Sequence, residues 1–554
     1  MAPKISRQIY RAFTKSYGLT LKAEAARYLE EILSDTPADE INDTLDHIVR
    51  TFTKYNQECI IVERIALEKI IEHLQTSAPG NPYLDKVHVD DTPQVPADEP
   101  FIDEEEEQDE FDPSQYLNVI NAFNMPKIRY RADIKGFSSD AGGASLFADA
   151  SAKARVFRER YEVIRQRVLR NETFSPASFS TRRMKESLQL TAIKALLGRQ
   201  GGSFLLLGML TRMSDGNFYL EDPDATVLLD MSECTTGIGL FTESCFVLIE
   251  GVYTDDEVFK VSSMGLPPPE RREASLAAHG NIDFLGSTTP FIDLPLLERK
   301  EKYFKNISFV ILSDVWLDHP KTLSNIRTMF QGYSAYVIPL AFIFIGNFTS
   351  KPFLYSGKES TKYKECFTAL ADLIAEFPTL ATFCYFIFVP GPQDPWGGNT
   401  LPRPPIPEVF TAKLRNKVKR AVFTTNPCRI KYCTQEIVIL REDILNRFRR
   451  NCVVTPNTAL EEDETRHLVK TLIDQSHLCP LPLHVRPTYW DYDHSLRLFP
   501  IPNLLVLADR CEQYGVTYEG CHCVNPGSFV SSDFSWRMYY PATRISERCA
   551  LPSR

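Results

Sequence analysis

Four apolar runs in the second half of the chain each end in a short polar loop. They are residues 309–312 before Ser313 and Asp314, residues 342–345 before Gly346 and Asn347, residues 386–389 before the loop 390–394, and residues 504–507 before Ala508 and Asp509. In α/β folds, active sites lie at the carboxyl ends of such strands. Phosphoester hydrolysis with two metal ions would need a bridging carboxylate and several imidazoles there, because two adjacent dications require anionic or neutral nitrogen ligands.

The loops resemble those of calcineurin-like metallophosphoesterases, which read Asp-x-His, Gly-Asp, Gly-Asn-His followed by Asp or Glu, and a late Gly-His-x-His. Asp314 is retained, but Trp316 stands where the first His belongs. Asn347 replaces the bridging Asp, and Pro392 and Gln393 replace the Asn-His pair. The pattern of the site is therefore present while most of its ligands are missing.

Three further side chains belong to this degenerate site. Asp394 ends the third loop, Asp509 lies roughly where the late Gly-His would fall, and His477 could be a surviving ligand position. Trp and Pro cannot ligate a metal ion, and amides add no charge to offset two dications. The sequence predicts no catalytic residues, no metal ligands and no cofactor. The alternative is an active metal-dependent phosphodiesterase with an unusual site built from Asp314, Asp394, His477 and Asp509.

The acidic residues are unevenly distributed. The net charge is −10, and ten of the 72 acidic residues lie in residues 98–112, which contain no Lys or Arg, so 62 acidic and 62 basic residues remain elsewhere. A neutral body argues against strong non-specific binding of nucleic acid, which needs a basic surface. The basic clusters at residues 155–160 and 447–450 are expected to be solvated helix faces.

Length, apolar runs and cysteine content limit the kinds of protein that this chain could be. A chain of 554 residues predicts roughly three or four domains. The longest apolar run, residues 336–345, is shorter than the ~20 residues of a membrane span, and no signal peptide opens the chain. Thirteen cysteines without a paired CxxC framework suit free thiols. We expect a soluble intracellular protein.

The first 113 residues predict a small domain and a tether. Residues 1–75 contain apolar side chains at helical spacing, from a helix capped by Thr20 with Leu21 on its apolar face to a third segment that includes Ile61. Residues 76–113 are rich in Pro and acidic residues, which favours a disordered linker.

Five short strand-like runs follow a connecting segment at residues 114–200. They are residues 204–210, 218–221, 225–230, 246–253 and 258–262, with a connector after the third. This order favours an OB-type barrel over residues 201–266. From residue 280 to 554, strands alternate with helical stretches, which indicates an α/β domain, and the Pro-rich residues 401–407 are expected to be a surface excursion from it.

The order of these parts resembles the B-subunit family of eukaryotic replicative DNA polymerases, and within it the branch of polymerase epsilon. The segments that carry the resemblance are residues 125–128, 157–161, 312–318, 389–395, 423–430, 432–437 and 525–529. The resemblance implies a multidomain α/β protein with a helical N-terminal domain like the lid of an AAA+ ATPase, an OB barrel and an inactive phosphoesterase-like domain.

The resemblance also implies a function and partners. The chain would be a non-catalytic accessory subunit of DNA polymerase epsilon in the nucleus. It would bind the zinc-binding C-terminal domain of the catalytic subunit, accompany the small histone-fold subunits, and contact GINS and the replicative helicase through the N-terminal domain. Weak contact with DNA inside the assembled polymerase is left open. A third hypothesis is an independent single-strand DNA-binding OB protein, which the neutral charge of the body disfavours.

Overall fold

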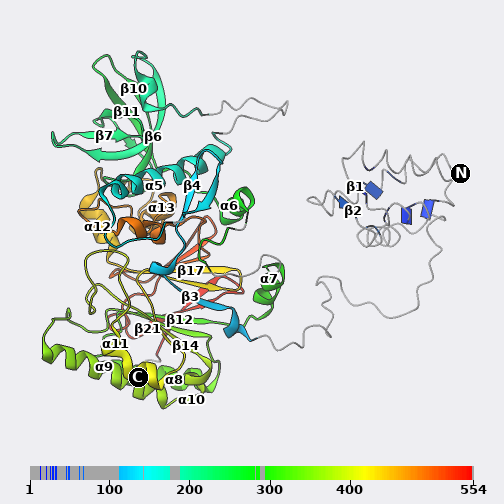
Figure 1. The fold of residues 1–554 in the computed structure, drawn as a ribbon, viewed down its shortest axis with the longest axis vertical. Helices are drawn as coiled ribbons and strands as arrows, with labels where there is room; N and C mark the ends of the chain where they lie inside the picture. Colours follow the sequence, from blue (N-terminus) through cyan, green and yellow to red (C-terminus); the bar gives the residue numbers. More distant parts are fainter. Residues whose placement is uncertain are drawn as a thin grey trace. The chain divides into compact units, whose positions relative to one another are not determined.

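The computed structural model describes residues 112–140, 142–174, 188–280, 282–286 and 294–551, and before these only scattered positions between 13 and 67. The chain forms two compact units, residues 1–108 and 109–554 (Figure 1). Nearly all of the expected acidic linker lies outside the described residues. The domain boundaries expected from the sequence remain predictions.

The first unit contains helical and extended segments. Ala25 and Leu29 lie in a helix and are buried, as expected. However, strand β1 (Thr20–Leu21) pairs in parallel with β2 (Ile61–Val62). The prediction that Leu21 and Ile61 are helical was therefore wrong, because short apolar segments do not distinguish helix from strand by periodicity and β-branched residues favour extended backbone.

A closed five-stranded barrel occupies one end of the second unit (Figure 1). Its strands are β6 (Ser203–Arg212), β7 (Phe218–Glu221), β8 (Thr226–Asp230), β10 (Phe246–Tyr253) and β11 (Val258–Gly265), joined by the short β9 (Thr235–Thr236). The barrel closes because β11 pairs in parallel with β8 and antiparallel with β10. All five strands coincide with the expected runs to within three residues.

Two six-stranded sheets form the rest of the second unit. The first has the order β15-β14-β13-β12-β21-β22 and the second the order β19-β20-β18-β17-β16-β3. The first sheet contains β12 (Phe309–Ser313), β13 (Ala341–Ile345), β14 (Tyr385–Val389), β15 (Ala421–Phe423), β21 (Ser535–Tyr540) and β22 (Ile545–Ala550). The second contains β3 (Leu117–Asn121), β16 (Cys428–Tyr432), β17 (Gln435–Arg441), β18 (Leu504–Ala508), β19 (Tyr514–Tyr518) and β20 (Cys521–Asn525).

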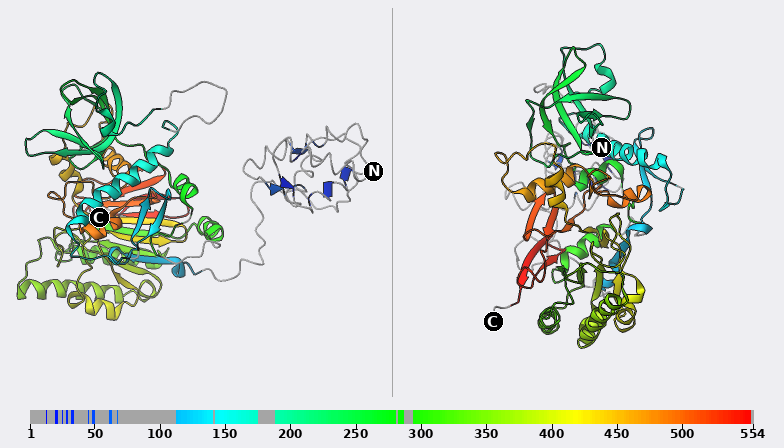
Figure 2. Two further views of the ribbon diagram at one scale, coloured as in Figure 1. Left: turned by 45° about the horizontal axis from the view of Figure 1, so that its top comes forward. Right: turned by 90° about the vertical axis from the view of Figure 1, so that its left-hand side faces the viewer.

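The helices cover the outer faces of the sheets (Figure 2). Those of the first sheet are α8 (Thr322–Ala335), α9 (Gly357–Ala375), α10 (Pro378–Phe383) and α11 (Glu408–Lys417). On the second sheet lie α12 (Ile444–Asn451) and α13 (Glu464–Asp474). The remaining elements are α5 (Ala150–Arg170), α6 (Arg272–His279), α7 (Leu294–Tyr303), β4 (Ile128–Arg131), β5 (Gly136–Ser139), η2 (Pro113–Tyr116), η3 (Ala122–Asn124), η4 (Ile193–Leu196) and η6 (Trp490–Leu496). None of the described helices is long and apolar enough to cross a membrane.

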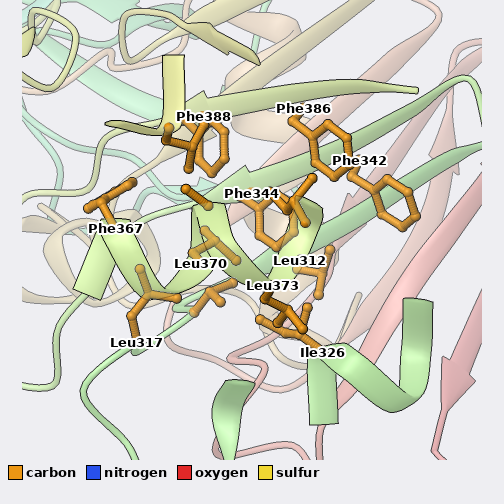
Figure 3. Close-up of a cluster of buried hydrophobic side chains, with 14 of the residues drawn as sticks. Leu312, Leu317, Ile326, Phe342, Phe344, Phe367, Leu370, Leu373, Phe386 and Phe388 are labelled. Atoms are coloured by element: carbon orange, nitrogen blue, oxygen red, sulfur yellow. The ribbon is translucent and has the colours of Figure 1, made fainter. Parts of the chain in front are cut away.

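Alternation along the strands produces three apolar layers. Ile343 and Ile387 point into the space between the two sheets, where they meet Ile439 and Val506 of the second sheet. Phe342, Phe344, Phe386 and Phe388 point the other way and pack on α8 and α9 (Figure 3). A third cluster packs the second sheet against α12 and α13. Both faces of the central strands are buried, which explains their continuous apolar sequence.

Three sequence expectations are corrected within this unit. Strand β3 pairs with β16, so the expected connecting segment supplies an edge strand of the second sheet. Leu401 and Arg403 are buried, so residues 401–407 are mostly interior and not a surface excursion. Arg160 of α5 is also buried and donates to Asp493, which a solvated helix face would not do. Each departure follows from pairing between segments distant in sequence, which local composition does not encode.

Buried polar contacts join the barrel to α13. The Gln475 side chain accepts a hydrogen bond from the Phe246 backbone N–H at 2.8 Å and donates to the Phe246 carbonyl at 2.7 Å. His467 Nδ1 lies 3.0 Å from the Gly239 nitrogen, and the Leu240 N–H donates to Thr471 Oγ1 at 2.8 Å. The barrel and the two sheets are therefore held together by specific hydrogen bonds.

Candidate functional site

The loops after β12, β13 and β14 meet at one place. Asp314 follows β12, and its Oδ1 accepts hydrogen bonds from the backbone N–H of Asn347 at 2.9 Å and from Asn347 Nδ2 at 3.1 Å. Asn347 Oδ1 in turn accepts from the Gln393 N–H at 2.9 Å. Gly391 is required beside them, because a Cβ there would lie 2.5 Å from Asn347 Oδ1. The first three loops thus form one tightly packed group.

A guanidinium lies against this group. Arg441 ends β17 in the second sheet, and its Nη2 lies 3.0 Å from Asp314 Oδ1 and 3.2 Å from Oδ2. Arg441 is fully buried and Asp314 is 2% exposed. The carboxylate that would ligate a metal ion is instead one half of a buried ion pair between the two sheets.

The other nitrogens of Arg441 are also paired. Its Nε donates to the Gly346 carbonyl at 3.0 Å, and its Nη1 donates to Asp443 at 2.7 Å and to the Ala508 carbonyl at 3.2 Å. Burial opposes the charged form, but the carboxylates of Asp314 and Asp443 outweigh it and raise the pKa of Arg441 above its ordinary value. The guanidinium therefore links the ends of β12, β13, β17 and β18.

Asp394 is held by donors and not by a cation. Its Oδ2 accepts from the Gly391 N–H at 2.7 Å, and its Oδ1 accepts from the Phe348 N–H at 2.9 Å and from the Tyr363 hydroxyl at 3.0 Å. Burial raises the pKa of Asp394 to about 6, although these hydrogen bonds oppose the shift. Its role in the described contacts is to fix the loop after β14.

Asp509 caps a helix. Its Oδ2 accepts hydrogen bonds from the N–H groups of Ile444 at 2.9 Å and Leu445 at 2.8 Å, at the start of α12. Burial raises the pKa of Asp509. A carboxylate in this position satisfies unpaired N–H groups of the first helical turn and interacts favourably with the helix dipole.

His477 lies in a different cluster. Its Nδ1 accepts from the Cys479 N–H at 3.0 Å, and its Nε2 lies 3.3 Å from Asp493 Oδ1, whose other partner is Arg160. Burial and the nearby Arg160 lower the pKa of His477 to about 4, so the imidazole is neutral at pH 7. The structure thus separates His477 from the loops with which the sequence grouped it.

The three remaining residues of the predicted site lie at its rim. Trp316, Pro392 and Gln393 are each partly exposed. Cys521 and Cys523 are buried in the core of the second sheet. His522, between them in the sequence, faces the opposite side of β20, where its Nε2 lies 2.8 Å from Ser546 Oγ. The three side chains therefore do not form a joint metal-ligand set.

The residues of the site do not fit a pair of metal ions. Asp314 accepts hydrogen bonds from Asn347 and from Arg441, whose charge would repel a dication. Within the described ranges, no three His, Cys, Asp or Glu side chains are grouped so as to hold a metal ion. The arrangement joins the two sheets through the ion pair of Asp314 and Arg441.

Sequence reasoning missed Arg441. A signal was present, because residues 437–440 are a fifth apolar run that ends in the polar residues Arg441, Glu442 and Asp443. The run precedes a basic residue, which a search for metal ligands passes over. A buried carboxylate at a strand end, such as Asp314, needs a cationic partner. Where no metal ligands accompany it, the sequence therefore indicates a buried Arg or Lys at a nearby strand end.

Comparison with known proteins identifies the class. Residues 309–516 match the family of the DNA polymerase alpha/epsilon B subunit, residues 150–268 match "DNA polymerase epsilon subunit 2-like, OB-fold domain", and residues 1–74 match "DNA polymerases epsilon N terminal". The five-stranded barrel is therefore an OB fold. A solved archaeal phosphodiesterase aligns with 44% of this chain and 100% of its own, at 10% identity and a TM-score of 0.24.

Two relatives match over nearly their whole length. "DNA polymerase epsilon subunit 2" of Homo sapiens is 39% identical over 100% of this chain and 99% of its own. The DNA polymerase epsilon B subunit of Schizosaccharomyces pombe is 34% identical over 97% of this chain and 94% of its own. The chain belongs to the family of DNA polymerase epsilon B subunits. It is an accessory subunit of that polymerase and takes part in DNA replication as a member of the polymerase complex.

Proposed function

We propose that this subunit is a non-catalytic scaffold, built on a phosphoesterase-like domain that has lost its chemistry. The observation that carries the proposal is the buried ion pair of Arg441 with Asp314. A phosphodiesterase would need Asp314 as a metal ligand, whereas here its charge is neutralised by a side chain of the same protein. A stable ion pair between two sheets is suited to a structural role.

The partners follow from the same proposal. The barrel and the two sheets would together bind the zinc-binding C-terminal domain of the catalytic subunit, near the small histone-fold subunits. The N-terminal unit, residues 1–108, would contact GINS and the replicative helicase in the nucleus, with a lid-like helical domain as the contact surface. This division is supported by the separation of the chain into two compact units.

An assay for phosphodiesterase activity tests the loss of chemistry. Purified chain is incubated with a nitrophenyl phosphodiester in the presence of Mn²⁺, beside the Asp314→Ala variant as control. We expect no turnover above the variant. Hydrolysis that the wild-type protein shows and Asp314→Ala abolishes would establish the active-hydrolase alternative.

Co-purification tests the scaffold role. The tagged chain is co-expressed with the catalytic subunit of polymerase epsilon, and both are expected to elute as one complex at moderate salt. Elution of the tagged chain alone would contradict the proposal.

A further inference from the structure

Three exposed apolar side chains gather at the rim of the degenerate site. Leu354 is 64% exposed, Tyr355 74% and Trp396 59%. They come from two loops, after β13 and after β14, that contact each other: the Trp396 N–H donates to the Tyr355 hydroxyl at 3.0 Å, and the Phe353 N–H donates to the Gln393 carbonyl at 2.9 Å. We call these three residues the rim patch.

The loop that carries Trp396 is rigidly held. The Gly397 N–H donates to the Asp394 carbonyl at 2.8 Å, and a Cβ on Gly397 would lie 2.6 Å from that same oxygen. Arg403 Nε donates to the Gly397 carbonyl at 2.5 Å, while its Nη2 donates to the buried Glu442 at 2.6 Å. The backbone around Trp396 is thus anchored to the interior by a buried arginine.

Trp396 itself has an unusual backbone. Its φ is 58°, in the left-handed region that bulky side chains rarely adopt. Such conformations persist where the surroundings impose them, and they concentrate at functional positions. A backbone held in this way loses little further conformational entropy when a partner covers the exposed side chain, which favours Trp396 as an interface anchor.

The charges beside the rim patch are mainly basic. Lys351 and Lys358 are exposed. Among the described residues of α9, the side chains that form ion pairs are Lys362 and Asp372, and Lys358 is not one of them. The acidic neighbours are Glu359, which is partly buried in the first turn of α9, and Asp318, which accepts a hydrogen bond from Ser350 and already lies 4.0 Å from Lys362. A partner that covers Trp396 would therefore meet an excess of positive charge.

We propose that the rim patch, with Lys351 and Lys358, is a docking surface for an acidic segment of another polymerase subunit. The segment would place an apolar or aromatic side chain against Trp396 and Tyr355, and its carboxylates near the two lysines. The loops that frame a metal site in a hydrolase would here present a protein-binding surface. This inference rests on the proposed scaffold function.

The test compares patch variants in the assembled polymerase. The full-length chain is titrated into the remaining subunits of polymerase epsilon, purified as one preparation, and Kd is measured at two salt concentrations. Trp396→Ala is expected to raise Kd at least about tenfold. The double change Lys351→Glu and Lys358→Glu is expected to weaken binding and to reduce its dependence on salt.

Matched controls use exposed residues at the opposite ends of the strands. Tyr336 is 89% exposed and precedes β13, so Tyr336→Ala removes a comparable aromatic side chain elsewhere. The double change Lys305→Glu and Lys419→Glu reverses the charge of two exposed lysines that precede β12 and β15. Both controls are expected to bind within about twofold of the wild type, and all variants should melt near the wild-type temperature.

A photocrosslinking residue at position 396 identifies the occupant. The expected crosslink, mapped by mass spectrometry, lies in an acidic peptide of another polymerase subunit. A crosslink to DNA or to a basic peptide overturns the inference, as do patch variants that bind as tightly as the wild type. If the wild-type chain itself fails to bind the remaining subunits, the scaffold function fails and the docking surface fails with it.

Discussion

At the scale of single residues, Arg441 takes over the electrostatic task that metal ions have in a hydrolase. Three carboxylates have protein partners here: Asp314 after β12 of the first sheet, and Asp443 and Asp509 after the adjacent strands β17 and β18 of the second. Burying one charge without its partner is costly, while a satisfied network is tolerated. The stability of the loops therefore depends on this pairing.

Removing Arg441 should be strongly destabilising. Arg441→Met leaves the buried Asp314 carboxylate without its cation, and we expect a loss of about 3–5 kcal/mol in the free energy of unfolding. The double change Asp314→Asn and Arg441→Met should lower the free energy of unfolding by less than the sum of the losses from the two single changes. Urea denaturation measures all three.

The exposed pair of Arg327 and Glu376 provides the control, because its two side chains are 46% and 47% exposed. Arg327→Met should leave stability unchanged within error. Additive effects of the Asp314 and Arg441 changes would show that the two charges do not support each other.

His477 should make the protein sensitive to acid. Its folded-state pKa of about 4 lies below the ordinary 6.5, so the unfolded chain binds more protons and stability falls as the pH drops from 6.5 towards 4. His477→Gln removes this contribution. Between pH 7 and pH 5 the wild type should lose about 2 kcal/mol more than the variant. Parallel curves for the two proteins in urea titrations across this pH range would refute the assignment.

At the scale of elements, the apolar strands and the polar loops after them were predictable, because burial on both faces leaves a continuous apolar run. Residues 309–312 and 342–345 show this directly. The grouping of Asp314, Asn347 and Asp394 followed from the rule that parallel strands end at one edge. The sequence placed His477 wrongly among the strand-end loops and did not predict the role of Arg441. Both positions depend on how the two sheets pack together, which local spacing does not determine.

Attachment of the barrel to α13 gives an element-scale prediction. Gln475→Ala leaves the N–H and carbonyl of Phe246 without their partners in a buried position. We expect a loss of about 2 kcal/mol or more, and melting of the barrel at a lower temperature than the sheets. Calorimetry of the variant tests both points.

Gln331, which is exposed on α8, serves as the matched control for Gln475. Gln331→Ala should leave the melting profile unchanged. A single transition at the wild-type temperature for Gln475→Ala would mean that these hydrogen bonds do not secure the barrel.

At the scale of the whole molecule, the two units should separate in function. A chain that lacks residues 1–75 retains all of the second unit, so we expect it to assemble with the catalytic subunit as the full chain does. Its attachment to GINS and the helicase should be weakened. Co-purification with each partner measures the two effects, and loss of polymerase assembly in this truncation would place the interface in the first unit.

The position of β3 has a consequence for synthesis of the protein. This strand, near residue 120, pairs with β16, which emerges from the ribosome more than 300 residues later, after the entire barrel. During translation the edge strand must wait while the barrel folds, and only then can the second sheet close. A gene fragment that begins at the barrel would leave the outer edge of β16 without its neighbour and open to association with other chains.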